Sequence, residues 1–126
     1  MSHLQRLHVR PNIDELTPAE KRYVQKNFDV YAGEVIVSGQ PISWTAIDEV
    51  EVAKAARTAG PSGWLVKYLV MGGERYHVGI YYGGLEAVLT NMTLNSAKYI
   101  VQTMAFYAPQ SILYSGPEGL SPLVDY

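Results

Sequence analysis

Apolar residues recur at strand spacing between residues 64 and 90, and this stretch organises the predicted fold. Two glycine pairs, Gly72-Gly73 and Gly83-Gly84, interrupt it. A Gly-Gly link between apolar runs is typical of a β-hairpin, because a type I′ turn requires positive φ at both central residues. The pattern therefore predicts an antiparallel meander of three strands, at residues 64–71, 74–82 and 85–90.

The two turns set the register of this meander, and the alternation of side chains then assigns each residue to a face. The register places Lys67 opposite Val78, and Ile80 opposite Ala87. Lys67 is the only charged residue on the apolar face, so we expect it to reach solvent at an edge, to pair with an acid or to mark a pocket. The apolar face is predicted to be core and carries Leu65, Leu69, Val78, Ile80, Leu85, Ala87 and Leu89.

The opposite face of the meander mixes aromatic and polar residues. The register pairs Trp64 with Tyr81, and Tyr68 with His77. This composition is expected of a contact surface, although aromatic residues also favour ordinary half-exposed strands. The residues predicted to bind a ligand or a partner are Trp64, Tyr68, Arg75, His77, Tyr81 and Glu86.

Shorter strands are predicted upstream of the meander. In one of them Val50 and Val52 face inward, while Glu49 and Glu51 alternate outward. Residues 55–63 contain Gly and Pro and are predicted to form a flexible loop. The upstream elements are a strand from Phe28 to Val37 with a bend at Ala32-Gly33, a turn at Ser38-Gly39, a return strand from Gln40, and a strand from Asp48 to Lys54.

A short helix is predicted near the N-terminus. Thr17 can cap it, Pro18 suits its first turn, and Glu20 can complete a capping box. We expect this helix to continue to about Lys26 on the surface, with Ala19, Tyr23 and Val24 turned to the core.

A longer helix is predicted from Asn95 or Ser96 to Ala108, ahead of Pro109. Tyr99 and Phe106 lie away from its apolar stripe, so a second partner must cover them: the N-terminal arm, the C-terminal tail or another subunit. The stripe at helical spacing consists of Ala97, Ile100, Val101, Met104 and Ala108.

Together these elements predict one domain over residues 1–126, in the α+β class and mainly β. We expect an antiparallel sheet or a partly open barrel of about six or seven strands, capped by the C-terminal helix and preceded by the short N-terminal helix. Residues 1–16 are predicted to be an extended arm and residues 110–126 an irregular tail.

The segment from Ile42 to Val52, Ile-Ser-Trp-Thr-Ala-Ile-Asp-Glu-Val-Glu-Val, followed by a meander and one helix, resembles bacterial pleckstrin-homology-like domains. The matching residues are Ile42, Trp44, Ile47 and Val50, and the resemblance covers roughly residues 28–108. It implies a bent, partly open barrel closed by its last helix, with ligands or proteins bound at loops or an edge. The chain lacks the basic first-hairpin loop that phosphoinositide binding requires in that family.

Composition limits the classes of function. A hydrophobic content of 48% and a charged content of 17% indicate a folded globule. The net charge of −2, without a basic run, gives no reason to expect nucleic acid. There is no cysteine, so thiol chemistry is excluded, and neither a metal nor a cofactor is expected. The N-terminus lacks a signal-peptide core and no apolar run reaches the roughly 18 residues of a membrane span, so we expect a cytoplasmic protein.

Three functions remain open. The first is a non-catalytic interaction module that self-associates as a homodimer, through the aromatic sheet face or the C-terminal helix. The second is a small domain that binds an anionic ligand through Lys67 or through Arg75, His77 and Tyr81. The third is an enzyme in which His77 and Glu86 act as a base and its partner, but no catalytic motif supports it. We therefore expect a protein that is not an enzyme.

Overall fold

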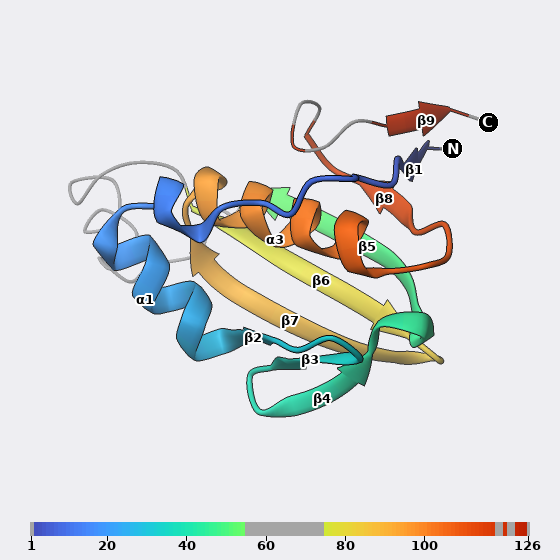
Figure 1. The fold of residues 1–126 in the computed structure, drawn as a ribbon, viewed down its shortest axis with the longest axis horizontal. Helices are drawn as coiled ribbons and strands as arrows, with labels where there is room; N and C mark the ends of the chain where they lie inside the picture. The colour runs from blue at the N-terminus through green and yellow to red at the C-terminus, as the bar shows by residue number, and fades with distance from the viewer. Residues whose placement is uncertain (1, 55–74, 118–119, 121–122, 126) are drawn as a thin grey trace, which may run out of the picture.

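The computed structural model describes residues 2–54, 75–117, 120 and 123–125, and of residues 2 and 123–125 it describes the backbone alone. Two 3-10 turns, Ile13–Glu15 and Trp44–Ala46, lie between the longer elements. The helices and strands are β1 (Ser2–Leu4), α1 (Pro18–Asn27), β2 (Phe28–Val30), β3 (Glu34–Val37), β4 (Gln40–Ser43), β5 (Ile47–Lys54), β6 (Tyr76–Tyr82), β7 (Leu85–Met92), α3 (Leu94–Tyr107), β8 (Leu113–Ser115) and β9 (Leu123–Asp125) (Figure 1).

The strands form two sheets. One is six-stranded, in the order β7-β6-β5-β8-β1-β9, and the other is three-stranded, in the order β2-β3-β4. All pairs are antiparallel except β5 with β8. The α+β class with mainly antiparallel strands is therefore confirmed, and no closed barrel is present in the part of the chain that the structure describes.

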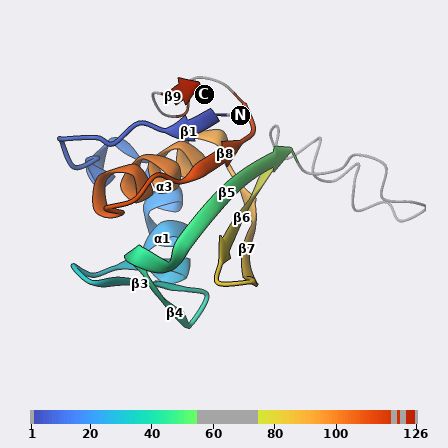
Figure 2. The same ribbon diagram turned by 90° about the vertical axis from the view of Figure 1, so that its right-hand side faces the viewer.

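The elements that cover β5, β6 and β7 all lie on one side of this sheet. Figure 2 shows α3, α1 and the β2–β4 sheet on the same side, with β5–β7 forming the opposite wall. The covered face carries the fully buried Val50, Val78 and Ile80. The other face of β5–β7, which we call the outer face, is not covered by any described element.

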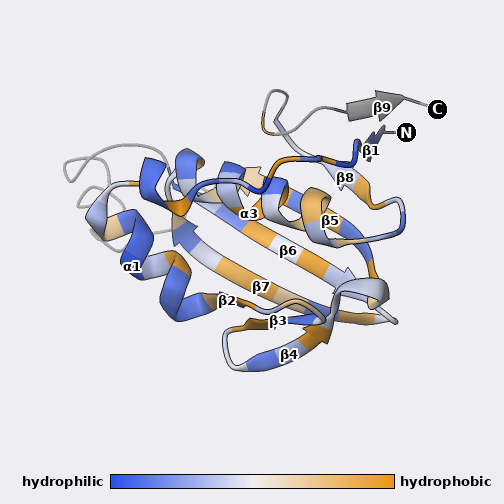
Figure 3. Cartoon of the chain, viewed as in Figure 1, coloured by the Kyte–Doolittle hydropathy of each residue, from blue (hydrophilic) through white to orange (hydrophobic). Residues whose placement is uncertain are grey.

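The core lies between this wall and α3. Ala97, Ile100, Val101, Met104 and Ala108 are all buried, so the predicted helical stripe is confirmed. Figure 3 shows apolar positions spread along β6 and β7. Val78, Ile80 and Leu89 are buried as predicted, but Leu85, which directly follows the Gly83-Gly84 turn, is 60% exposed.

Trp44 joins the two sheets to the end of α3. Its indole stacks on Tyr107, with ring centroids 5.0 Å apart, and meets the edge of Phe28 at 6.4 Å. The indole N–H donates to the carbonyl of Tyr31 at 2.7 Å. Gln110 Nε2 donates to the carbonyls of Trp44 and Ile47. Trp44 is thus a core residue that fixes the three-stranded sheet against the helix.

The predicted turn at Gly83-Gly84 is confirmed. Both glycines have positive φ, 55° and 80°, as a type I′ turn requires. The resulting register pairs Tyr82 with Leu85, Tyr81 with Glu86 and Ile80 with Ala87, as predicted. Ser38-Gly39 forms a second tight turn with φ values of 49° and 85°.

The predicted partner of β6 was wrong. Val78 pairs with Val52 of β5 on one side and with Leu89 of β7 on the other, so β6 has no edge for a strand at 64–71. Residues 64–71 and the predicted turn at Gly72-Gly73 lie outside the described residues. The mistake arose because periodicity identifies strands and their faces but does not identify which strand is the neighbour.

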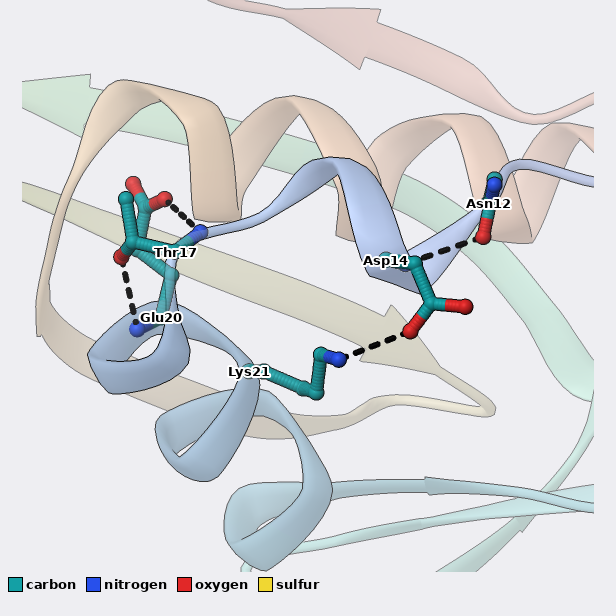
Figure 4. Close-up of polar contacts among 5 residues, drawn as sticks. All are labelled: Asn12, Asp14, Thr17, Glu20 and Lys21. Carbon is teal, nitrogen blue, oxygen red and sulfur yellow. Dashed lines mark hydrogen bonds and ion pairs between the residues drawn. The ribbon is translucent and has the colours of Figure 1, made fainter.

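The start of α1 agrees with its prediction. The Thr17 hydroxyl accepts from the N–H of Glu20, and the Glu20 carboxylate accepts from the N–H of Thr17 at 2.9 Å (Figure 4). Asp14 forms an ion pair with Lys21 at 2.7 Å, also drawn in Figure 4. Val24 is buried and Tyr23 partly buried, but Ala19 is exposed and Glu20 is buried in its place.

The cap of α3 is Thr93, one residue before the helix and two to three residues before the predicted start. Its hydroxyl accepts from the N–H of Ser96 at 3.2 Å. The same hydroxyl donates to the carboxylate of Glu20. Glu20 therefore joins the first turns of both helices, which its position in α1 alone could not reveal.

The N-terminal arm covers the second side of α3. Leu7 N donates to the carbonyl of Ala105 at 3.1 Å, and Leu4 N to the carbonyl of Ile112. Tyr99 is buried under this cover, while Phe106 is partly exposed. The arm covers this side of the helix in the structure.

The two chain ends contain more strand than predicted. β1 forms in the predicted arm, and β8 and β9 form in the predicted irregular tail. They pair with one another and, through β8, with β5. The described residues consequently hold nine strands instead of six or seven. Strands of three residues carry too short an alternation to be recognised from sequence.

Candidate functional site

The outer face of β5–β7 is the candidate site, and its side chains form rows across the three strands. In the first row Glu49, Tyr81 and Glu86 lie side by side. The next row consists of Glu51, Gly79 and Val88. The outer face therefore gathers three carboxylates around one tyrosine.

Tyr81 lies between two of these carboxylates. Its hydroxyl donates to Glu51 Oε1 at 3.0 Å. The hydrogen bond to Glu51, and then the one with Glu86, raise the pKa of Tyr81 well above its ordinary value of 10.0, because both carboxylates favour the neutral phenol. This end of the outer face is electronegative and does not suit an anionic ligand.

Gly79 allows the Tyr81 ring to lie back along the strand. A Cβ placed on Gly79 would stand 3.4 Å from the Tyr81 hydroxyl and 3.5 Å from its ring. The ring thus runs over the glycine and reaches Glu51, which is opposite Gly79 on β5. The close approach of an aromatic ring explains the glycine in the middle of a strand.

His77 has a structural partner. The ladder between β6 and β7 shifts register between Tyr76 and Val78, and Asn91 takes a φ of 59° at this bulge. The N–H of Asn91, which the bulge leaves out of the ladder, donates to His77 Nδ1 at 3.3 Å. His77 therefore accepts a hydrogen bond from the backbone and is not aligned with Glu86, which lies beside Tyr81.

The structure brings only part of the predicted site together. Tyr81 and Glu86 are neighbours on the outer face, His77 lies further along β6, and Arg75 precedes that strand and is partly buried. Trp64 and Tyr68 lie outside the described residues, as does Lys67.

Two acidic residues of β5 were missed as site residues. Glu51 holds the Tyr81 hydroxyl, and Asp48 accepts from the N–H of Gly83 at 3.1 Å, anchoring the β6–β7 turn. The outward alternation of Glu49 and Glu51 was visible in the sequence. It could not indicate contact with Tyr81, because the pairing of β5 with β6 was not predicted.

Exposed apolar side chains concentrate on β7 and just after it. Leu85 is 60% exposed, Val88 46% and Leu94 40%. Of the described residues, only Val9 and Tyr31 are other large apolar or aromatic residues with this much exposure. β7 is also an edge strand, since no described strand pairs with its second side.

Two hollows are lined by described residues. One of about 170 Å³ lies between the arm and the end of α3, where Arg6, Gln110 and Ser111 contribute to its lining. Gln110 Oε1 is buried without a hydrogen-bond partner among the described residues, a situation that an ordered water commonly resolves. The volume falls below the roughly 300–1,000 Å³ of typical small-molecule sites. Another hollow of about 300 Å³ lies between residues 10–13 and Tyr99.

The described residues include no group of three or more His, Asp or Glu side chains that could hold a metal ion. Nor do they include a helix long and apolar enough to cross a membrane. Comparison of the chain with protein-family models, with curated proteins and with solved structures found no match. The geometry of β5–β7 is therefore the basis for the functional conclusion.

Proposed function

We propose that this chain is a non-catalytic interaction module that self-associates as a homodimer through β7. The observation that carries the proposal is that the edge strand β7 exposes apolar side chains on both of its faces, Val88 on the outer face and Leu85 on the other. A strand edge with exposed apolar side chains is typical of a place where a further strand pairs.

The outer face supports a contact surface over a catalytic site. His77 Nδ1 accepts a hydrogen bond from the N–H of Asn91, and the Tyr81 hydroxyl donates to Glu51. A general base needs a nitrogen or oxygen within reach of a substrate proton. Here His77 Nδ1 and the Tyr81 hydroxyl are already engaged in hydrogen bonds within the chain.

The binding of an anionic ligand has less support. Glu51 and Glu86 lie at the Tyr81 hydroxyl, so an anion there would meet two carboxylates. A protein surface, by contrast, can place apolar atoms on Val88 and donors on the carboxylates at its rim.

The resemblance to pleckstrin-homology-like domains and the cytoplasmic location belong to the same proposal. The order of a three-stranded antiparallel sheet, the β5–β7 meander and α3 supports the resemblance. In that family an edge or a loop would bind the partner, which agrees with a contact at β7.

The proposal is tested by light scattering of the chain at micromolar to hundred-micromolar concentration. We expect the mass to rise with concentration toward twice the 14.0 kDa of one chain. Val88→Glu should lower the mass at each concentration, because it adds a charge to the apolar part of the surface. Val9→Glu is the matched control, since Val9 is 79% exposed on the arm, and it should leave the dimer intact. A wild-type mass of 14.0 kDa at all concentrations would refute self-association.

A further inference from the structure

The outer edge of β7 has the backbone arrangement of a strand that can pair with another strand. Tyr82 and Leu85 flank a two-residue turn, so they form a hydrogen-bonded pair and the pattern alternates from there. The N–H and C=O of Ala87 and Leu89 accordingly point to β6. Those of Glu86 and Val88 point away from the sheet.

The usable edge ends at Leu89. The carbonyl of Thr90 also points outward, but the Tyr23 hydroxyl of α1 donates to it. α1 thus occupies the edge from Thr90 onward, as the contact between α1 and β7 indicates. The open segment is Leu85–Leu89, which contains a single charged residue, Glu86.

Other edges of the two sheets are less suited to pairing. β4 carries Pro41 opposite Ile36, at a position whose backbone points away from β3. Proline lacks an N–H and is a common means of blocking an edge. β2 and β9 are each three residues long. β7 has eight residues and contains neither lysine nor proline.

We infer that two copies of this chain pair through β7, antiparallel and about a two-fold axis at Ala87, to form one continuous sheet. This inference rests on the proposed function and names the contact that makes the dimer. In this register Glu86 lies opposite Val88 of the second copy, and the outward N–H and C=O groups of both residues are paired. A two-fold arrangement lets one segment serve both copies.

Charge and hydrogen bonding select this register over its neighbours. A shift of two residues in one direction sets Glu86 opposite Glu86 of the second copy, and like charges directly opposite are unfavourable. A shift in the other direction requires the Thr90 carbonyl, which Tyr23 already uses. The register about Ala87 avoids both conflicts.

Side chains on both faces fit this register. On the outer face Val88, which is 46% exposed, packs against the methylene groups of Glu86 of the second copy. On the covered face the small Ala87 meets Ala87 of the second copy at the axis, where antiparallel strands approach most closely. Leu85, 60% exposed in one chain, lies opposite Leu89 of the second copy, whose side chain is buried in its own core.

A pair of charge substitutions at one position tests the register. Val88→Glu places a carboxylate opposite Glu86 of the second copy, twice per dimer, and should raise the dissociation constant roughly two- to thirtyfold. Val88→Lys places an ammonium opposite the same carboxylate and should keep or lower the dissociation constant. The double variant Glu86→Lys with Val88→Glu should restore the dimer.

A backbone substitution tests the strand pairing itself. The N–H of Val88 points away from β6, so Val88→Pro removes no hydrogen bond of the β6–β7 ladder but removes a donor to the second copy. It should raise the dissociation constant roughly five- to hundredfold. Val88→Ile, which keeps the N–H and the strand-forming side chain, is the control and should dimerise like the wild type. Circular dichroism and melting of each variant show that the monomer is folded.

The outcomes separate the two claims. Val88→Glu and Val88→Lys could weaken the wild-type dimer equally. That result would show that Val88 is buried in some other geometry. The edge pairing would then be wrong, and self-association would stand. A dimer unaffected by Val88→Pro in a folded protein would also overturn the edge pairing. A wild-type chain that is monomeric at all concentrations would refute both.

Discussion

Glu20 shows how one residue can connect elements distant in sequence. Its carboxylate accepts from the N–H of Thr17 in α1 and from the hydroxyl of Thr93, which caps α3. A carboxylate near the N-termini of two helices also meets the positive end of both dipoles. The sequence predicted the first contact from local spacing, but the second joins residues 73 positions apart and has no local signal.

This geometry predicts a pH dependence of stability. Burial raises the pKa of Glu20, but the hydrogen bonds from Thr93 and Thr17 outweigh it, so the pKa lies below its ordinary value of 4.5. A depressed pKa means that the ionised form stabilises the fold above pH 4.5 and that this contribution is lost as the pH falls through the folded-state pKa.

Glu20→Gln should therefore lower the free energy of unfolding by about 1 kcal/mol at pH 7. The difference from wild type should shrink as the pH falls below 4.5. Urea unfolding of both proteins at about four pH values between 3 and 7 measures the difference in their free energies of unfolding. A difference that stays constant over this range would show that the charge of Glu20 does not contribute.

At the scale of elements, the turn between β6 and β7 was predictable because its chemistry is local. Gly83-Gly84 permits positive φ at both positions, and that requirement fixed the register of five cross-strand pairs from Tyr82–Leu85 to Val78–Leu89. The caps at Thr17 and Glu20 were predictable for the same reason, since they lie three residues apart.

The turn predicts the effect of a β-branched residue. Gly84 has a φ of 80°, and a Cβ at this residue would have no neighbouring atom within 4 Å, so a substitution there meets backbone strain alone. Gly84→Val should lower the free energy of unfolding by roughly 1–3 kcal/mol. Gly33→Ala is the control, because Gly33 has neither a positive φ nor a close neighbour, and it should be nearly neutral. Equal melting temperatures for Gly84→Val and wild type would contradict the type I′ geometry.

What the sequence could not predict at this scale was the neighbour of each strand. Periodicity placed Val50, Val52 and Val78 correctly in the core, yet β6 was assigned to residues 64–71 instead of β5. Turn residues indicate the pairing of strands that are consecutive in sequence. The pairing of strands separated by a long loop depends instead on how the whole chain packs around its core. The link between Glu51 and Tyr81 was missed as a direct consequence.

At the scale of the whole molecule, one face of the β5–β7 wall is covered and the other is not. α3, α1 and the second sheet share the covered side, and the N-terminal arm closes the far side of α3. Of the alternatives predicted for the second side of the helix, the N-terminal arm is the one that the structure shows there. Two of the exposed large apolar residues, Leu85 and Val88, lie on β7, which favours the sheet as the proposed interface.

The most direct test of edge pairing is amide hydrogen exchange of Glu86, Ala87, Val88 and Leu89, followed by NMR at several protein concentrations. Ala87 and Leu89 bond to β6 in either state, so their amides should exchange slowly throughout. The amides of Glu86 and Val88 should exchange rapidly in dilute protein and become protected as the concentration rises, in proportion to the dimer present. Rapid exchange of Glu86 and Val88 at every concentration, in protein that light scattering shows to be dimeric, would contradict the pairing of β7 with a second copy.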